Sequence, residues 1–172
     1  LTHDGGLTAI RIEGPTNSVD QRVNRLSKEL GLLDQELSIL DSEQSNIFWS
    51  RTKNLEVFKS LKSNLLRIVL PMSETLQVIQ KLKNFEIKYF IDWGGGLIWA
   101  SFDQLNTKIL SEIKDTVKKH QGYITLIKVE EDLKASADIF TIDPIKYKIS
   151  EKIKRSFDPK RIFNPGKMYT GI

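Results

Sequence analysis

The end of the chain carries the residues whose types and spacing are best suited to chemistry. From Phe157 to Lys167 the sequence reads FDPKRIFNPGK, with two prolines and one glycine. This pattern predicts a helix stop and then a tight turn, with Ile162 and Phe163 as an apolar anchor. The turn would present Asn164, whose amide can donate and accept hydrogen bonds at a planar heterocycle. Asn164 is therefore the first candidate binding residue. The alternative is that this segment has only a structural role and holds the end of the chain in place.

The sequence offers little for metal or nucleophilic chemistry. It contains no cysteine, which excludes disulfides, thiolate metal sites, iron–sulfur ligation and cysteine nucleophiles. His3 and His120 have no partner at metal-ligand spacing, so we expect surface or core residues and no metal site. The acids at 130–132 are typical of a solvated loop, and nothing predicts an acid–base pair across a cleft. The catalytic residues are therefore left unassigned.

Phosphate and nucleic-acid sites are also disfavoured. The glycines at 94–96 precede a second β-rich run, whereas a phosphate cradle needs a helix N-terminus at that point, so a hairpin turn is favoured. Trp99 and Phe102 are three positions apart and would point to opposite faces of a strand, unlike the stacked aromatics of an RNA-binding sheet. The net charge of +4 comes from lysines that alternate with acids, which is typical of a solvated surface.

Length and composition indicate a globular chain. The 172 residues, 40% of them hydrophobic and 28% charged, suit one domain or one domain with a small extension. No apolar run approaches the ~20 residues that cross a bilayer, and we see no signal-peptide pattern. Because position 1 is Leu and not Met, we expect a fragment or a processed chain.

The second half predicts six elements in the order β-α-β-β-α-β, the ferredoxin-like split unit. Strands are expected at 65–70, 87–92, 97–102 and 123–129. Ser73 is expected to cap the first helix, which carries Leu76, Ile79, Leu82 and Phe85 at helical spacing. Ile109, Leu110, Ile113 and Val117 mark the second helix.

The first half and the C-terminus add further elements. Strands are expected at 7–13 and 37–40, around a helix capped by Thr16 or Asn17 and ended by Gly31. A second helix is expected to begin at Asp41, because Asp41 to Gln44 resembles a capping box. Asp143-Pro144 opens a last helix over 145–157. We therefore predict an α+β fold with helices on one face of the sheet, an N-terminal β-α-β extension, and a C-terminal helix with an Asn-Pro-Gly turn. Residues 1–143 would form the α+β domain and 144–172 the helix and tail.

The tail pattern iK-x-x-FDP-x-x-ifNPGkm resembles the C-terminus of FAD-linked oxidases of the vanillyl-alcohol oxidase type. More narrowly, the chain resembles the FAD-binding accessory subunit of bacterial glycolate oxidase. Three other stretches agree: Ile10 to Gly14, Phe48-Trp49 followed by Arg51, and Leu70-Pro71 entering a helix. The resemblance covers nearly the whole chain.

This resemblance implies an N-terminal FAD domain followed by an α+β cap, of which only the cap-like part is present. FAD would then be bound mostly by the missing domain and would be absent from the fragment, which we expect to be inactive alone. In catalytic relatives the cap supplies a histidine-built metal site. This sequence has no pair of histidines that could build such a site, so it fits the accessory subunit better than the catalytic one. By the same resemblance Asn164 approaches the flavin, and Lys167 is the second candidate.

The family also implies partners: a catalytic flavoprotein subunit and an iron–sulfur subunit, in a complex that oxidises glycolate to glyoxylate. We expect no nucleic-acid partner. We also expect a cytoplasmic location, and the complex could hold the chain at the inner face of the membrane. The alternative is a ferredoxin-like domain that binds a small molecule or has a regulatory role, without redox activity. This alternative stays open because many unrelated functions share this element order.

Overall fold

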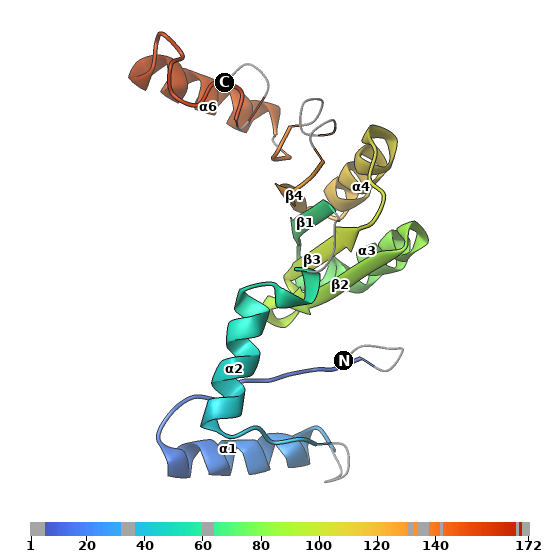
Figure 1. Ribbon diagram of the computed structural model, residues 1–172, viewed down its shortest axis with the longest axis vertical. Coiled ribbons are helices and arrows are strands. Elements are labelled where there is room, and N and C mark those ends of the chain that lie inside the picture. Colours follow the sequence, from blue (N-terminus) through green and yellow to red (C-terminus); the bar gives the residue numbers. More distant parts are fainter. Residues whose placement is uncertain are drawn as a thin grey trace. The chain divides into compact units, whose positions relative to one another are not determined.

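The computed structural model describes residues 6–31, 37–59, 64–130, 133, 138–141, 143–167 and 169. They belong to two compact units, Leu1–Lys59 and Ser60–Ile172. The predicted division at 143/144 stays a prediction. Among the described helices, none has the length and apolar character that a membrane crossing requires. Figure 1 labels the elements of the second unit that matter most: β1 (Asn64–Val69), α3 (Thr75–Leu82), β2 (Ile87–Asp92), β3 (Leu97–Phe102), α4 (Thr107–Lys119), β4 (Tyr123–Lys128) and α6 (Pro144–Phe157).

The second unit is built on a four-stranded sheet in the order β2-β3-β1-β4. All three neighbouring pairs are antiparallel, with register partners such as Ile68↔Ile98, Ile68↔Ile124 and Ile91↔Ile98. The chain order β-α-β-β-α-β with this strand order confirms the predicted ferredoxin-like unit and the α+β class. The predicted hairpin at 94–96 is also confirmed, since β2 and β3 pair directly across it.

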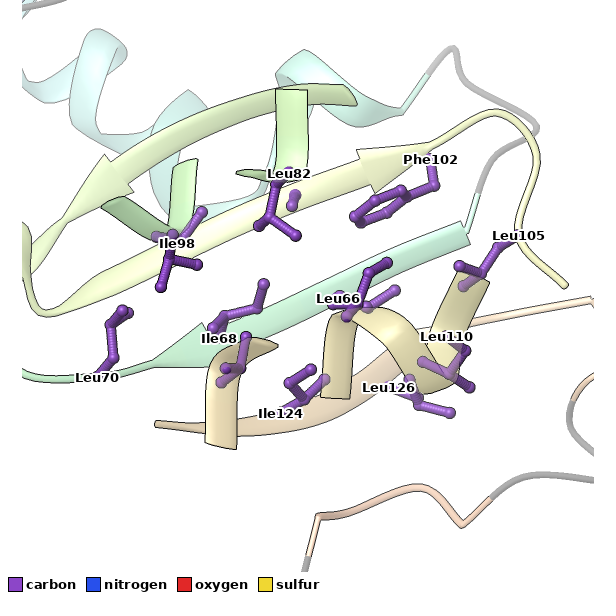
Figure 2. Close-up of a cluster of buried hydrophobic side chains, with 14 of the residues drawn as sticks. Leu66, Ile68, Leu70, Leu82, Ile98, Phe102, Leu105, Leu110, Ile124 and Leu126 are labelled. Atoms are coloured by element: carbon purple, nitrogen blue, oxygen red, sulfur yellow. The ribbon is translucent and has the colours of Figure 1, made fainter. Parts of the chain in front are cut away.

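One face of the sheet packs against α3 and α4 to form the core (Figure 2). Strand side chains alternate between faces, so the even-numbered residues of β1, β3 and β4 point to the helices. The three core residues of α4 recur at three and four positions, which puts them on one helix face. The shared core comprises Leu66 and Ile68 from β1, Ile98, Ala100 and Phe102 from β3, Ile124 and Leu126 from β4, Val78, Ile79 and Leu82 from α3, and Leu110, Ile113 and Val117 from α4.

The start of α3 differs from its prediction. A short 3-10 turn, η3 (Met72–Glu74), precedes α3, and the side chain of Ser73 caps nothing. The hydroxyl of Ser73 instead lies 3.4 Å from the Glu74 carboxylate. Leu76 is 70% exposed, because the buried face of α3 is formed by the residues at 75, 78, 79 and 82. The predicted cap is therefore wrong, while the helix itself is confirmed.

The first unit contains α1 (Thr16–Glu29), α2 (Ser42–Lys53) and the 3-10 turn η2 (Glu56–Phe58). Pro15 is the N-cap of α1 and no side chain caps it, so the prediction of Thr16 or Asn17 was wrong. Gly31 follows α1 with φ +64, the left-handed conformation expected for a helix end. The capping box of α2 is confirmed: Gln44 N donates to Asp41 Oδ1 and Asp41 N to Gln44 Oε1.

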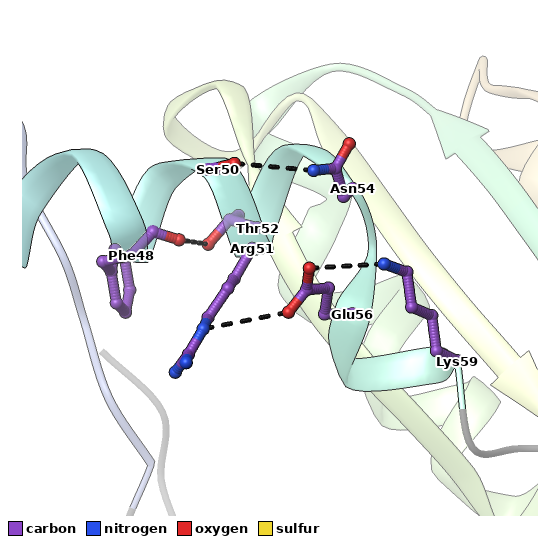
Figure 3. A network of polar contacts seen from close by, with 7 residues as sticks. All are labelled: Phe48, Ser50, Arg51, Thr52, Asn54, Glu56 and Lys59. Atoms are coloured by element: carbon purple, nitrogen blue, oxygen red, sulfur yellow. Dashed lines mark hydrogen bonds and ion pairs between the residues drawn. The ribbon is translucent and has the colours of Figure 1, made fainter.

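The end of α2 is held by a local polar network (Figure 3). Leu55 adopts the left-handed conformation with φ 54, so helix α2 does not continue into η2. Glu56 bridges the two elements, because its carboxylate lies 3.8 Å from Arg51 Nε and 3.2 Å from Lys59 Nζ. Neither α1 nor α2 contains a buried residue.

The two strands predicted in the first half are wrong. Residues 7–13 and 37–40 are described, and neither segment forms a strand. Arg11 in the first segment instead pairs with Glu13 at 2.7 Å and contacts Asn46. A run of alternating residues shows that a segment could be a strand, but a strand also needs a hydrogen-bonded neighbour, which alternation does not reveal.

Candidate functional site

Residues 139–141 lead from the sheet toward the candidate site. Thr125 and Phe140 form an antiparallel bridge, with Leu126 N donating to Ile139 O and Thr141 N donating to Ile124 O. This segment therefore lies beside β4, which is one of the two edge strands of the four-stranded sheet. Its position gives the chain a fixed starting point for the C-terminal helix and tail.

The last helix, α6, begins as its sequence predicts. Asp143 is the N-cap, and its carboxylate accepts a hydrogen bond from Ile145 N at 2.8 Å. Pro144 occupies the first turn, where a missing N–H costs nothing. The helix ends at Phe157, and Asp158, which precedes Pro159, is its C-cap. The predicted helix and both of its ends are confirmed.

Asp158 organises the tail that follows. Its carboxylate accepts hydrogen bonds from the backbone N–H groups of Ile162 and Phe163, both at 2.9 Å. Lys154, one turn back in α6, lies 2.8 Å from Asp158 Oδ2 and also donates to the carbonyl of Phe163. We call Lys154 and Asp158, with these backbone groups, the tail staple. It folds residues 159–163 back against the end of α6.

The staple also explains the titration of Asp158. The hydrogen bond from Lys154 lowers the pKa of this carboxyl to about 2, and the bonds from Ile162 and Phe163 act in the same direction. The carboxyl is thus ionised at every physiological pH, so the staple stays formed there.

Beyond the staple, residues 164–167 form the predicted tight turn. Lys167 N donates to Asn164 O at 3.2 Å, and Gly166 has φ +68. Proline at the second position and a positive φ at the third are typical of a type II turn. Asn164 itself has φ 47, a conformation that asparagine tolerates better than most residues. The turn therefore has a defined backbone conformation, with Asn164 at its first position.

The side chains of Asn164 and Lys167 are both exposed. Among the described residues, neither side chain has a hydrogen-bond or ion-pair partner. An exposed amide on such a turn is suited to the edge of a planar ring, since it can donate and accept at once. The geometry thus fits one contact with such a ring, and the contact itself stays a prediction.

A small aromatic group ties the tail to the sheet edge. The ring of Tyr169 lies 5.9 Å from Phe140 and 6.1 Å from Tyr147 of α6. Edge and tilted contacts at these distances are favourable for aromatic rings. The tail is therefore held at both ends, by the staple and by Tyr169.

The histidines do not form a metal site within the described part of the chain. His3 lies outside the described residues. His120 Nδ1 lies 2.6 Å from Glu74 Oε2, and its Nε2 lies 3.1 Å from Lys81 Nζ. His120 therefore links the end of α4 to η3 and α3. No group of three or more metal-ligating side chains occurs in the ranges that the structure describes. Of the acids at 130–132, only Glu130 is described.

The sheet face opposite the helices carries a second group of side chains. Trp99 and Phe102 point to opposite faces as predicted, with Phe102 fully buried in the core. Trp99 contacts Phe90 across the strands, at 6.5 Å between ring centroids. On β1, the guanidinium of Arg67 lies 5.0 Å from the centroid of Trp93, a residue that is 58% exposed. This cation–π pair has no ion-pair partner among the described residues.

The comparison with protein families bears on the tail. Residues 140–168 match the family described as FAD linked oxidases, C-terminal domain. Over this segment the chain is similar to the C-terminal domain of FAD-linked oxidases. The matched segment begins at the bridge residue Phe140 and includes α6, the tail staple and the Asn164 turn. A search of curated proteins and a search of solved structures found no significant match.

The staple was missed by the sequence reasoning. Asp158 was interpreted only as part of a helix stop, and Lys154 was given no role. A signal was present, because a lysine and an aspartate four residues apart are neighbours on a helix. An aspartate at a helix end can also accept the backbone N–H groups of the residues that follow. The predicted apolar anchor is wrong, because the side chains of Ile162 and Phe163 are 66% and 67% exposed. These residues are held through their backbone N–H groups, which donate to Asp158.

Proposed function

We propose that this chain is the C-terminal cap part of a flavoprotein subunit of a glycolate (2-hydroxy-acid) oxidase complex. The observation that carries the proposal is the match of residues 140–168 to the FAD-linked oxidase C-terminal domain, on a segment with an ordered, exposed turn. Oxidation of glycolate to glyoxylate releases two electrons and two protons, and bound FAD would accept them.

The chain's own contribution would be a contact with the flavin ring. Asn164 would hydrogen-bond to the ring edge with its amide, and Lys167 would be the second contact at the end of the same turn. The staple of Lys154 and Asp158 would hold the turn in place without touching the cofactor. Asn164 is thus a binding residue in this proposal, and the staple residues are positioning residues.

The chain fits one part of FAD and not the whole cofactor. In the described ranges, the glycine-rich segment at 94–96 joins two strands, so it does not present a helix N-terminus to a pyrophosphate. By the resemblance to FAD-linked oxidases, a separate N-terminal flavin-binding domain would hold most of FAD. We expect the 172-residue chain alone to bind FAD weakly and to oxidise no glycolate.

The partners and the location belong to the same proposal. A catalytic flavoprotein subunit would carry out substrate oxidation, and an iron–sulfur subunit would accept the electrons. The complex would be cytoplasmic and could lie at the inner face of the membrane.

The experiment uses the natural gene product that carries this chain, purified together with its partner subunits. The expected result is a bound flavin whose absorbance is bleached under anaerobic conditions by glycolate, and less by larger 2-hydroxy acids. Bleaching by another 2-hydroxy acid and not by glycolate would refute the substrate assignment. A natural gene product without flavin, alone and in its complex, would refute the proposal as a whole.

A second candidate function rests on the Arg67–Trp93 pair. A ferredoxin-like domain that binds a small anionic metabolite could use an arginine beside exposed aromatic rings. A thermal-shift screen of carboxylate metabolites against the 172-residue chain would separate the two functions. A saturable rise in Tm that Arg67→Met abolishes would favour this candidate, and no shift with any metabolite would exclude it.

A further inference from the structure

The four-stranded sheet has one edge to which the described part of the chain adds no further strand. β2 and β4 are the two edge strands (Figure 1). Beside β4 lies the segment 139–141, joined to it by the bridge between Thr125 and Phe140. Within the described residues, β2 pairs only with β3. An edge strand of this kind keeps a row of unpaired N–H and C=O groups, which can pair with the strand of another molecule.

The hydrogen bonds of the sheet show which groups of β2 point outward. Leu70 N donates to Gly96 O in the ladder between β1 and β3. Residues of a central strand bond alternately to its two neighbours, so the even-numbered residues of β3 bond to β1 and the odd-numbered ones to β2. By the register of β2 with β3, the even-numbered residues of β2 complete these bonds. The N–H and C=O groups of Ile87, Tyr89 and Ile91 therefore point away from the sheet.

The strand β2 is regular and carries one charge of each sign on the same face. Its sequence IKYFID contains no proline, and its register with β3 runs without a bulge, so two common obstacles to edge pairing are missing. Ile87 and Tyr89 pack against the core, so Lys88, Phe90 and Asp92 lie on the opposite face of the sheet. Lys88 is exposed and has no ion-pair partner among the described residues.

We propose that two copies of this chain pair through their β2 strands, antiparallel about a twofold axis at Phe90. In this register Lys88 of one copy lies opposite Asp92 of the other, and the same pair recurs on the other side of the axis. Tyr89 lies opposite Ile91 in the same way, and their outward N–H and C=O groups exchange both hydrogen bonds. Opposite charges directly across an antiparallel pair are stabilising.

The two neighbouring registers lack this match. With Tyr89 on the axis, Asp92 would lie opposite Glu86, and like charges directly opposite are destabilising. With Ile91 on the axis, Asp92 would lie opposite Phe90, and the two strands would overlap over fewer residues. Charge complementarity therefore selects the register centred on Phe90.

This pairing is separate from the proposed flavin contact. The segment that matches FAD-linked oxidases begins at the bridge beside β4, at the opposite edge of the sheet. β3 and β1 lie between the two edge strands, which are thus about 14 Å apart at ~4.8 Å per strand. Two copies could therefore pair while each keeps its flavin contact, and loss of one contact in an experiment would not entail loss of the other.

The test is the association state of the 172-residue chain, measured by sedimentation velocity over a range of protein and salt concentrations. We expect a dimer that weakens as salt is added. Lys88→Asp places acids opposite acids and Asp92→Lys places lysines opposite lysines, so each change should weaken the dimer by at least about tenfold. An equimolar mixture of the two variants should form a heterodimer about as tight as the unmodified dimer, because opposite charges again face each other on both sides of the axis.

The control is Lys108→Asp, which makes the same charge change at an exposed position of α4 and should leave the dimer unchanged. Asp92→Lys also removes the hydrogen bond that the Asp92 carboxylate accepts from Trp93 N at 2.7 Å, and recovery on mixing shows that this variant still folds. A monomer at every concentration would overturn the proposal, as would variants that stay dimeric or that do not recover when mixed.

The natural gene product that carries this chain should form the same dimer. A natural gene product that stays monomeric while the 172-residue chain dimerises would assign the edge of β2 to another segment of the same polypeptide and would also overturn the proposal.

Discussion

Replacing Gly122 by alanine should unfold the second unit more easily, because the new methyl group has no room. Gly122 connects α4 to β4, and a Cβ there would lie 2.7 Å from Val117 Cγ1, 2.9 Å from Leu70 Cβ and 2.9 Å from the carbonyl oxygen of Val69. Val117 is 1% exposed and Leu70 is 6% exposed, so neither side chain has space to retreat. The third neighbour is the backbone of β1, which is fixed by two strand ladders.

Overpacking of this kind costs about 1–3 kcal/mol. For a unit of this size, each kcal/mol lowers the Tm by roughly 4–8 °C, so we expect a fall of roughly 5–20 °C. The matched control is Gly96→Ala, where φ is −82 and the nearest neighbour of a Cβ would be 3.6 Å away. The control should melt within a few degrees of the unmodified chain, or slightly above it. Thermal unfolding followed by circular dichroism measures both, and a Gly122→Ala variant as stable as the Gly96→Ala variant would refute the packing of α4 on β1.

Two further predictions concern helix ends. Asn106 caps α4 by accepting a hydrogen bond from Ile109 N at 2.9 Å, so Asn106→Ala should lower the free energy of unfolding by about 1 kcal/mol, whereas Asn106→Asp should change it by only a few tenths. Urea unfolding of both variants measures the free energy of unfolding. A loss in Asn106→Ala that Asn106→Asp does not share would come from the capping hydrogen bond and not from substitution at this position in general. The pKa of Asp158 is lowered from 3.8 to about 2, so the contribution of the staple is complete above about pH 4 and is lost as the pH falls through about 2. Amide exchange at Ile162 and Phe163 should therefore accelerate at low pH, and in Asp158→Asn at neutral pH; unchanged exchange in that variant would contradict the staple.

The second half of the fold was predictable because its local signals agree with one another. Each strand from β1 to β4 combines branched or aromatic residues with a glycine, a proline or a helix start at its boundary. The two helices carry apolar residues at helical spacing, and the element order then limits the sheet to few topologies. The errors in this part concern α3: a 3-10 turn displaced the predicted start at Ser73, Leu76 is exposed, and Phe85 lies in a 3-10 turn after the helix.

The first half was less predictable for a physical reason. Residues 7–13 and 37–40 have strand-like composition, but strand formation depends on a partner distant in sequence. The helices were predicted correctly, since a capping box such as Asp41 and Gln44 is a local feature. Local sequence patterns therefore identified the helices, whose hydrogen bonds are local. They failed for the two predicted strands, because a strand needs a partner strand to pair with.

At the candidate site, the turn was predictable and its support was not. Asn164-Pro165-Gly166 predicts a tight turn from conformational preferences alone. The position of the turn depends on Asp158 accepting two backbone hydrogen bonds and on Tyr169 packing beside Phe140. These contacts join residues whose relationship appears only after the chain has folded back on α6.

The most direct test of the central claim is the effect of Asn164→Gly on the flavin of the natural gene product, purified with its partner subunits. Glycine keeps the positive φ of this position and removes only the amide side chain, so the turn should persist. Lys160→Ala, an exposed change in the same tail, is the control. The account predicts that Asn164→Gly shifts the absorbance spectrum and the reduction potential of the flavin, while Lys160→Ala leaves both unchanged. A flavin with the same spectrum and potential in all three proteins would contradict the assignment of Asn164 to the flavin.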